Sequence, residues 1–146
     1  MKRLISTLAV LLCMFSLLVI PAMAVNSETN HAILYDDGSY ALITFGENNP
    51  TRSSDNFYRT YTYYNPLGQK CFSYTLYATF TYNGVTSQAD FCDFSAAIYR
   101  QGWDIDAHSE YISGNTAYGN ATFTGPEGQV RTANLTLTCD KNGNVT

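Results

Sequence analysis

The strongest constraint on the fold is a run of alternating side chains over residues 71–81, which is followed by Asn83-Gly84. One set of alternate positions holds Phe72, Tyr74, Leu76, Ala78 and Phe80, and the other holds Cys71, Ser73, Thr75, Tyr77, Thr79 and Thr81. Side chains two apart lie on the same side of an extended strand, so the first set predicts a core face and the second a face that meets water. Asn-Gly is the strongest short hairpin signal. The run therefore predicts a half-buried antiparallel strand that ends in a hairpin.

Other segments with the same period-two pattern recur along the chain, and none shows a convincing helical stripe. They cover residues 32–35, 40–45, 57–64, 85–99, 103–108, 116–124 and 129–139. Turn residues separate them, for example Asp36-Asp37-Gly38 and Gly125-Pro126-Glu127-Gly128. Within 85–99 the alternation is clean only from Cys92, which predicts a bulge or bend. Seven or eight short strands at roughly 8 to 12 residue spacing predict an all-β, antiparallel, immunoglobulin-like sandwich.

The first 24 residues have the pattern of a secretory signal peptide. Lys2 and Arg3 precede an apolar stretch from Leu4 to Ile20, and Ala22-Met23-Ala24 fits a signal peptidase site. Cleavage after Ala24 leaves residues 25–146, 122 residues, as a single domain with no further apolar span. An uncleaved anchor is the alternative, although spans usually need about 20 residues. We therefore expect a secreted protein that is associated with the cell surface.

The chain that remains after cleavage is acidic. It holds twelve Asp and Glu but only six Lys and Arg, because two of the eight basic residues lie in the leader, so its formal net charge is −6. Nucleic acid binding depends on clustered positive charge, which makes nucleic acid a poor candidate partner. With two histidines and few charges of either sign, the chain has few side chains that could act as a general acid or base. We predict no enzyme activity, no cofactor and no metal site.

Residues 103–110 form an acidic segment that is a candidate chemical site. Asp104, Asp106 and His108 alternate with Trp103, Ile105 and Ala107, and Glu110 lies beyond, so the polar set is expected to point outward together. Calcium takes several oxygens that converge from a loop, whereas alternate residues on a flat strand fan apart. The carboxylates also lack an evident reason for a raised pKa. We interpret the segment as a solvated strand face, with a small hydrolase as a distant alternative.

Export leaves three cysteines in an oxidising compartment, where pairing is expected. Cys92 and Cys139 both lie on predicted inward faces, whereas Cys71 lies on the threonine face. This favours a Cys92–Cys139 disulfide across the core and leaves Cys71 as a free thiol. Cys71 is then either a small buried apolar residue or the handle for an intermolecular disulfide in a homodimer.

Several of these stretches together resemble a group of small exported proteins of Gram-positive bacteria. They are TLYATFTYNG at 75–84, Cys92, Trp103, SGNTAYGNATF at 113–123 and the closing LTLTCDKNGNV, within residues 70–145. The resemblance implies a leader peptide, a compact β domain of unknown function and a frequent cysteine pair, from which the additional Cys71 departs. It supplies no catalytic residues.

Tyrosine is the main anomaly of the composition, since all twelve tyrosines fall within residues 25–146. One interpretation is structural, because Tyr and Thr suit pleated strands and cross-strand pairs. The other is a recognition surface, because Tyr offers rigid contact area and loses little entropy on binding. Candidate binding residues are Tyr58, Tyr64, Tyr77 and Tyr99, with cell-wall glycan or another protein as the partner. A structural or assembly protein that pairs through strand edges or Cys71 is the alternative function.

Overall fold

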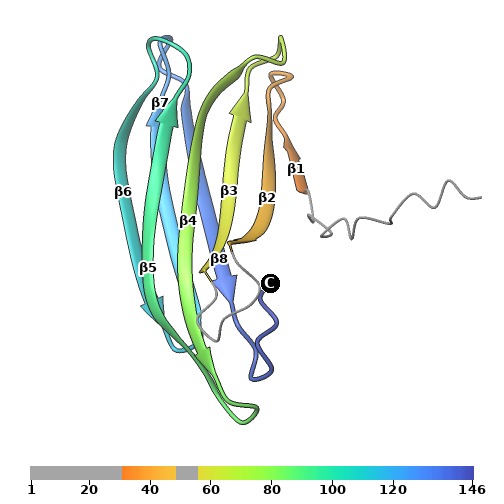
Figure 1. The fold of residues 1–146 in the computed structure, drawn as a ribbon. Coiled ribbons are helices and arrows are strands. Elements are labelled where there is room, and N and C mark those ends of the chain that lie inside the picture. Colours follow the sequence, from red (N-terminus) through yellow and green to blue (C-terminus); the bar gives the residue numbers. More distant parts are fainter. Residues whose placement is uncertain (1–30, 49–55) are drawn as a thin grey trace, which may run out of the picture.

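The structure, a computed structural model, describes residues 31–48 and 56–146, and these form strands without any helix. The strands are β1 (His31–Leu34), β2 (Tyr40–Asn48), β3 (Asn56–Tyr64), β4 (Lys70–Tyr82), β5 (Ser87–Ile98), β6 (Asp104–Ser113), β7 (Thr116–Thr124) and β8 (Val130–Thr138). They build a five-stranded antiparallel sheet, β1 to β5, and a three-stranded one, β6 to β8. Figure 1 shows the two sheets as stacked layers. The predicted all-β sandwich is confirmed.

Strand order within each sheet is consecutive, so every neighbour in a sheet is also the next strand in the chain. The chain passes from one sheet to the other between β5 and β6, through the turn at residues 99–103. Each sheet is therefore a meander, whereas immunoglobulin domains join their strands in a Greek key. The likeness to those domains lies in the two-sheet architecture and not in the connections.

The core forms where the alternating positions of β4 meet the second sheet. Its five predicted core residues, from Phe72 to Phe80, are at most 1% exposed, which confirms the predicted core face. The Phe72 ring stacks on that of Phe123 in β7, with centroids 3.9 Å apart, and also contacts Trp103 at 4.9 Å. The two layers are thus held together by aromatic packing.

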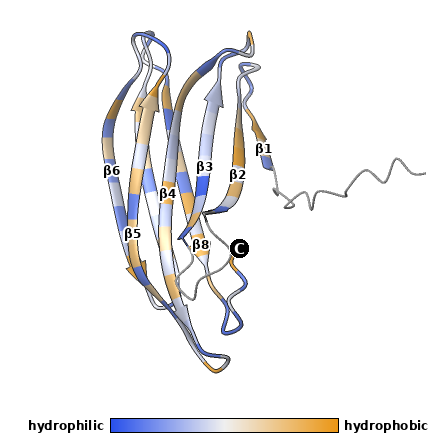
Figure 2. Ribbon diagram, viewed as in Figure 1, coloured by the Kyte–Doolittle hydropathy of each residue, from blue (hydrophilic) through white to orange (hydrophobic). Residues whose placement is uncertain are grey.

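Tyrosines supply part of this core, and hydropathy alone does not reveal them. Figure 2 shows β3 as a mostly pale or blue strand, although its Tyr61 and Tyr63 are 1% and 2% exposed. The hydroxyl lowers the hydropathy of tyrosine, but it is satisfied inside the protein: the hydroxyls of Tyr35 and Tyr61 share a hydrogen bond of 2.6 Å. A buried tyrosine needs such a partner.

The second face of β4 does not meet water along its whole length. Ser73 and Thr75 are 8% exposed, and of this face only Thr81 near the end of the strand is an exposed residue. Cys71 is 1% exposed, so its expected place on the water-facing side is wrong. The register between β3 and β4 shifts at Tyr63/Tyr64 and leaves Cys71 without a residue opposite it. This β-bulge turns the thiol toward the interior.

The predicted Cys92–Cys139 disulfide is not formed, and Cys71, Cys92 and Cys139 are all free thiols. Both Cys92 and Cys139 lie against the core, but at different levels of the sandwich. Cys139 is beside Ser87 at the beginning of β5, where its carbonyl accepts a hydrogen bond of 2.7 Å from the Ser87 hydroxyl. Cys92 is five residues further along β5, about 16 Å at the rise of an extended strand. Cα atoms of bridged cysteines lie within about 7 Å, so a shared inward face is not sufficient.

The predicted signal peptide, residues 1–24, lies outside the described residues. Within residues 31–48 and 56–146 no helix is long and apolar enough to cross a membrane.

Candidate binding face

The outer surface of the five-stranded sheet gathers most of the tyrosines that are not in the core. Strand alternation turns Tyr58 and Tyr64 on β3, and Tyr77 on β4, away from the second sheet. Tyr40 on β2 lies directly opposite Tyr64, and Tyr99 joins the rim just after β5. The four predicted binding residues therefore lie on one surface together with Tyr40, which the prediction did not include. We call this surface the tyrosine face.

The rings on this face are arranged in cross-strand pairs. Tyr40 and Tyr64 stack with centroids 4.8 Å apart and planes 7° from parallel. Tyr58 and Tyr77 are also directly opposite each other, with centroids 6.3 Å apart at 46°. Such pairs stabilise a sheet by roughly 0.2–1 kcal/mol each. Pairing therefore accounts for the positions of the rings, but it does not bury their solvent-facing sides.

Gly46 determines how the Tyr58 ring lies. The two residues are partners across β2 and β3, and a Cβ atom added at Gly46 would approach the Tyr58 ring to 2.3 Å. The ring therefore lies directly over the backbone of β2, in space that any side chain at position 46 would occupy. The predicted strand 40–45 ends just before Gly46, whereas β2 continues to Asn48, so the sequence prediction missed this residue. A glycine inside a strand often marks close approach by a neighbour.

Tyr99 closes one end of the face. It is 52% exposed, its hydroxyl lies 3.3 Å from that of Ser73, and the Lys70 ammonium sits 4.0 Å from the ring centroid. The hydrogen bond with Ser73 and the nearby Lys70 lower the pKa of Tyr99 below its ordinary value. The ring is thus held against β4 by one polar contact and one cation–π contact.

Small hydroxyl side chains fill the space between the rings. Thr60 and Thr75 are opposite each other and share a hydrogen bond of 2.9 Å, while the Tyr77 hydroxyl lies 3.2 Å from that of Ser95. Among the described outward positions of β2 to β5, charged side chains occur at Lys70, Asp90 and Asp93. Lys70 and Asp90 lie toward the ends of their strands, whereas Asp93 is directly opposite Tyr77. The tyrosine face therefore carries few charges, with one carboxylate beside its central pair of rings.

A shallow hollow of about 240 Å³ interrupts the face beside Tyr77. Thr79, Phe91 and Asp93 line it, together with Asn56 and Ala78. Phe91 is 56% exposed, which is unusual for so large an apolar ring. The sequence prediction missed it, because Phe91 precedes the segment in which the alternation of β5 becomes regular.

The acidic segment on β6 does not act as one group. The register between β6 and β7 shifts between Ile105 and Ala107. Asp106 stays on the outer side, where it accepts a hydrogen bond from the Thr124 hydroxyl. His108 and Glu110 turn inward instead, so the expectation that they point outward with Asp104 and Asp106 is wrong. The β-bulge changed the parity of the strand, which a period-two count does not detect.

The inward pair joins the edge of the core. The Tyr74 hydroxyl donates to Glu110 Oε1 at 2.6 Å, and Glu110 Oε2 lies 3.1 Å from His108 Nδ1. Burial, followed by this bond to Glu110, raises the pKa of Tyr74. Burial is also the main reason that the pKa of Cys92 is raised, which opposes formation of a thiolate. No group of three or more His, Cys, Asp or Glu side chains in the described segments is arranged to hold a metal ion.

Fold and face together define an all-β sandwich with a broad aromatic surface of few charges on its larger sheet. No family model, curated protein or solved structure matches this chain. A proposed function therefore depends on the geometry of the tyrosine face.

Proposed function

We propose that this chain is a non-catalytic module that binds glycan at or near the bacterial surface. The observation that carries the proposal is the gathering of Tyr40, Tyr58, Tyr64, Tyr77 and Tyr99 on one side of the five-stranded sheet, where charged side chains are few. Export through the leader at residues 1–24 belongs to the proposal, because a surface glycan is met only outside the cell.

An aromatic face with few charges suits glycan for two reasons. The C–H side of a sugar ring is apolar and packs on an aromatic ring, while its hydroxyls both donate and accept hydrogen bonds, as do those of Tyr and Thr. The rings are also fixed before binding, by stacking for Tyr40 and Tyr64 and by the Gly46 backbone for Tyr58. Little side-chain entropy then remains to be lost on association.

The test is a pull-down on insoluble bacterial cell wall and on purified polysaccharides, with the chain from Val25 onward. Tyr58→Ala with Tyr77→Ala should weaken binding at least tenfold, because both rings leave the middle of the face. Tyr111→Ala with Tyr118→Ala is the matched control, since these tyrosines stack at 4.8 Å and 10° on the outer side of the smaller sheet. Unchanged binding in the first double variant, or equal loss in both, contradicts the proposal.

Assembly with other chains is the second candidate function. β1 is a four-residue edge strand, and its Leu34 is 81% exposed, which leaves an edge open to pairing with another strand. A homodimer disulfide through Cys71 requires the chain to open locally, because this residue is buried. Strand-edge pairing predicts dimers by light scattering that persist in reducing buffer and disappear in Leu34→Lys.

A further inference from the structure

Four turns meet at one end of the sandwich, the upper end in Figure 1. They connect β1 to β2, β3 to β4, β5 to β6 and β7 to β8. Together they surround a cavity of about 460 Å³, within the range of about 300–1,000 Å³ that is usual for small-molecule sites. We call it the loop-end cavity.

The walls of this cavity are preformed. Three of the turns share one hydrogen-bond pattern around a glycine at positive φ, for example Gly68 N–H to Asn65 O at 2.9 Å and Asn65 N–H to Gln69 O at 3.0 Å. This is the three-residue hairpin loop with a G1 bulge. The turns also support each other, because a Cβ added at Gly102 would come within 2.7 Å of Pro126. A ligand would therefore enter a site that requires little ordering.

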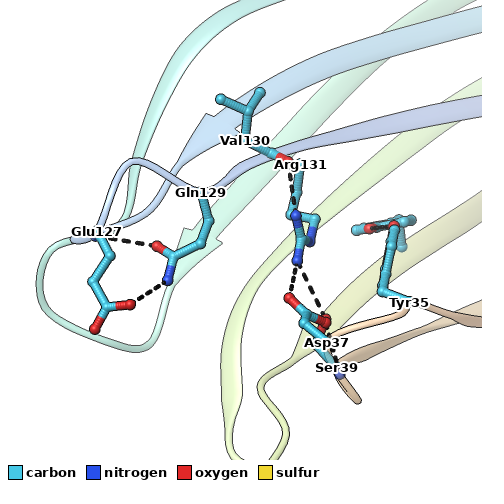
Figure 3. A network of polar contacts seen from close by, with 8 residues as sticks. Tyr35, Asp37, Ser39, Glu127, Gln129, Val130 and Arg131 are labelled. Carbon is cyan, nitrogen blue, oxygen red and sulfur yellow. Dashed lines mark hydrogen bonds and ion pairs between the residues drawn. The ribbon is translucent and has the colours of Figure 1, made fainter.

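Polar groups project from the walls, and aromatic rings contribute to the lining. Figure 3 shows two polar pairs beside each other, Glu127 with Gln129 after β7, and Arg131 with Asp37 beside the β1–β2 hairpin. The Gln129 amide donates to Glu127 Oε2 at 3.1 Å, and Arg131 forms an ion pair with Asp37. Trp103, which is half-buried, supplies the aromatic surface, with the buried Tyr63 behind it at a centroid distance of 5.1 Å.

The charges around the cavity balance. Hydrogen bonds from Ser39, and then the Arg131 guanidinium, hold the pKa of Asp37 below its ordinary value, so this carboxylate is ionised and paired. Glu127 on one wall is matched by Arg100 on another, and Arg100 donates to Gln69 Oε1 at 2.5 Å. A strongly anionic ligand would meet the Asp37 and Glu127 carboxylates, and a cation would meet the Arg100 guanidinium. A purely apolar ligand would leave the amides and carboxylates desolvated.

We propose that the loop-end cavity binds a single uncharged sugar unit, either a free monosaccharide or the end of a glycan chain. Such a ligand offers many hydroxyls to the Glu127, Gln129 and Arg100 side chains and one apolar side to the aromatic lining. A cavity at one end of the sandwich accepts the end of a glycan chain, which the extended tyrosine face does not select. The inference does not depend on the tyrosine face, because the ligand class follows from the lining of the cavity.

Trp103 makes the test direct, since it is the only tryptophan of the chain and it lines the cavity. Its fluorescence is titrated with glucose and with N-acetylglucosamine, and with glucose 6-phosphate and lysine as charged comparators. One uncharged sugar should give a saturable change with a dissociation constant of about 1 mM, as expected for so small a ligand. No saturable change with either sugar up to 100 mM, or tighter binding of a charged comparator, overturns the proposal.

Variants locate the binding. Glu127→Ala and Arg100→Ala, both at exposed positions, should each raise the dissociation constant at least fivefold. Lys141→Ala is the control, because it changes an exposed residue in a turn of the same hydrogen-bond pattern between Asp140 and Asn144, outside this cavity. Equal affinities in all three variants contradict the assignment. Tyr58→Ala with Tyr77→Ala should leave this titration unchanged, so a failed pull-down and a failed titration are separate results.

Discussion

Tyrosines on the inner and outer sides of the same two strands are held in different ways. Tyr61 on β3 and Tyr74 on β4 point into the sandwich, and each hydroxyl has one partner at 2.6 Å, Tyr35 or Glu110. Tyr58 and Tyr77 point outward on the same strands and pack ring against ring. The inner tyrosines are therefore fixed by their rings and by buried hydrogen bonds. The outer ones are held mainly by their rings, and the hydrogen bond of 3.2 Å between the Tyr77 and Ser95 hydroxyls is exposed.

Each side also has a glycine that makes room for a tyrosine. A Cβ at Gly119 on β7 would lie 2.6 Å from the Tyr74 hydroxyl, and one at Gly46 on β2 would lie 2.3 Å from the Tyr58 hydroxyl. The local sterics are alike, but the surroundings are not, because Tyr74 is fully buried whereas Tyr58 is half-buried and has solvent on its outer side. A glycine that faces a tyrosine ring therefore contributes to stability inside the sandwich and to the shape of the surface outside it.

The largest expected effect is that of Gly119→Ala. The new methyl group displaces the Tyr74 hydroxyl from Glu110 and presses on Leu76, so overpacking and a lost buried hydrogen bond add together. We expect a loss of about 2–4 kcal/mol in the free energy of unfolding. Urea denaturation followed by circular dichroism measures it. A loss below about 1 kcal/mol would mean that the inner tyrosine is as free to move as the outer one.

Alkaline pH gives the next largest effect. Burial, and then the bonds to Tyr35 and Glu110, raise the pKa values of Tyr61 and Tyr74 above the ordinary value of 10.0. The folded state keeps these protons when the unfolded state loses them, so their contribution is constant below about pH 10 and falls as pH rises further. Each tyrosine should remove about 1.4 kcal/mol per pH unit above that point.

Single substitutions separate the contribution of each tyrosine to this pH dependence from that of the buried thiols, whose pKa values burial also raises. Tyr74→Phe should reduce the slope of unfolding free energy against pH between about pH 10 and 11.5 by about 1.4 kcal/mol per unit. Tyr61→Phe should do the same. Denaturation curves at closely spaced pH values provide the measurement, and slopes identical to that of the unchanged protein would show that neither proton is held by the fold.

Much of the inner side could be predicted from the sequence, because burial imposes strict alternation. The core positions of β4 and the inward Leu135 and Leu137 on β8 follow from period two alone. The errors on Cys71 and His108 share one cause: each lies at or just beyond a β-bulge, and one inserted residue reverses the side on which the following side chains lie. A bulge depends on contacts between strands, which a count along one strand does not contain.

On the outer side, the sequence predicts which tyrosines point outward but not how their rings combine into one surface. Alternation places Tyr58, Tyr64 and Tyr77 outward, yet which rings meet depends on the register of β2, β3 and β4. Tyr40 and Gly46 belong to the tyrosine face because that register places them opposite Tyr64 and Tyr58. The loop-end cavity was beyond reach for the same reason, since its lining comes from four turns that are distant in the sequence.

Gly46→Ala should change binding more than stability. The added methyl group meets the far end of the Tyr58 ring and displaces it toward the solvent on its outer side, so the loss in unfolding free energy should stay below about 1 kcal/mol. The displaced ring no longer lies over β2, and we expect about fivefold weaker retention on the polysaccharide that the unchanged protein binds. Pull-down and urea denaturation on one preparation measure both. A large stability loss without a change in retention would place Tyr58 in a purely structural role.

Reducing agent should have the smallest effect, and that absence of effect is informative. A Cys92–Cys139 disulfide would stabilise the fold by about 4 kcal/mol through loop closure, and its reduction would lower the melting temperature by more than about 10 °C. With all three thiols free, the melting temperature should stay within about 1 °C in dithiothreitol. Iodoacetamide and mass spectrometry on the native protein should then label the partly exposed Cys92 before the buried Cys71 and Cys139. Labelling of Cys71 first would mean that the bulge at the start of β4 opens readily, and the inner side would not be the rigid region that its tyrosines indicate.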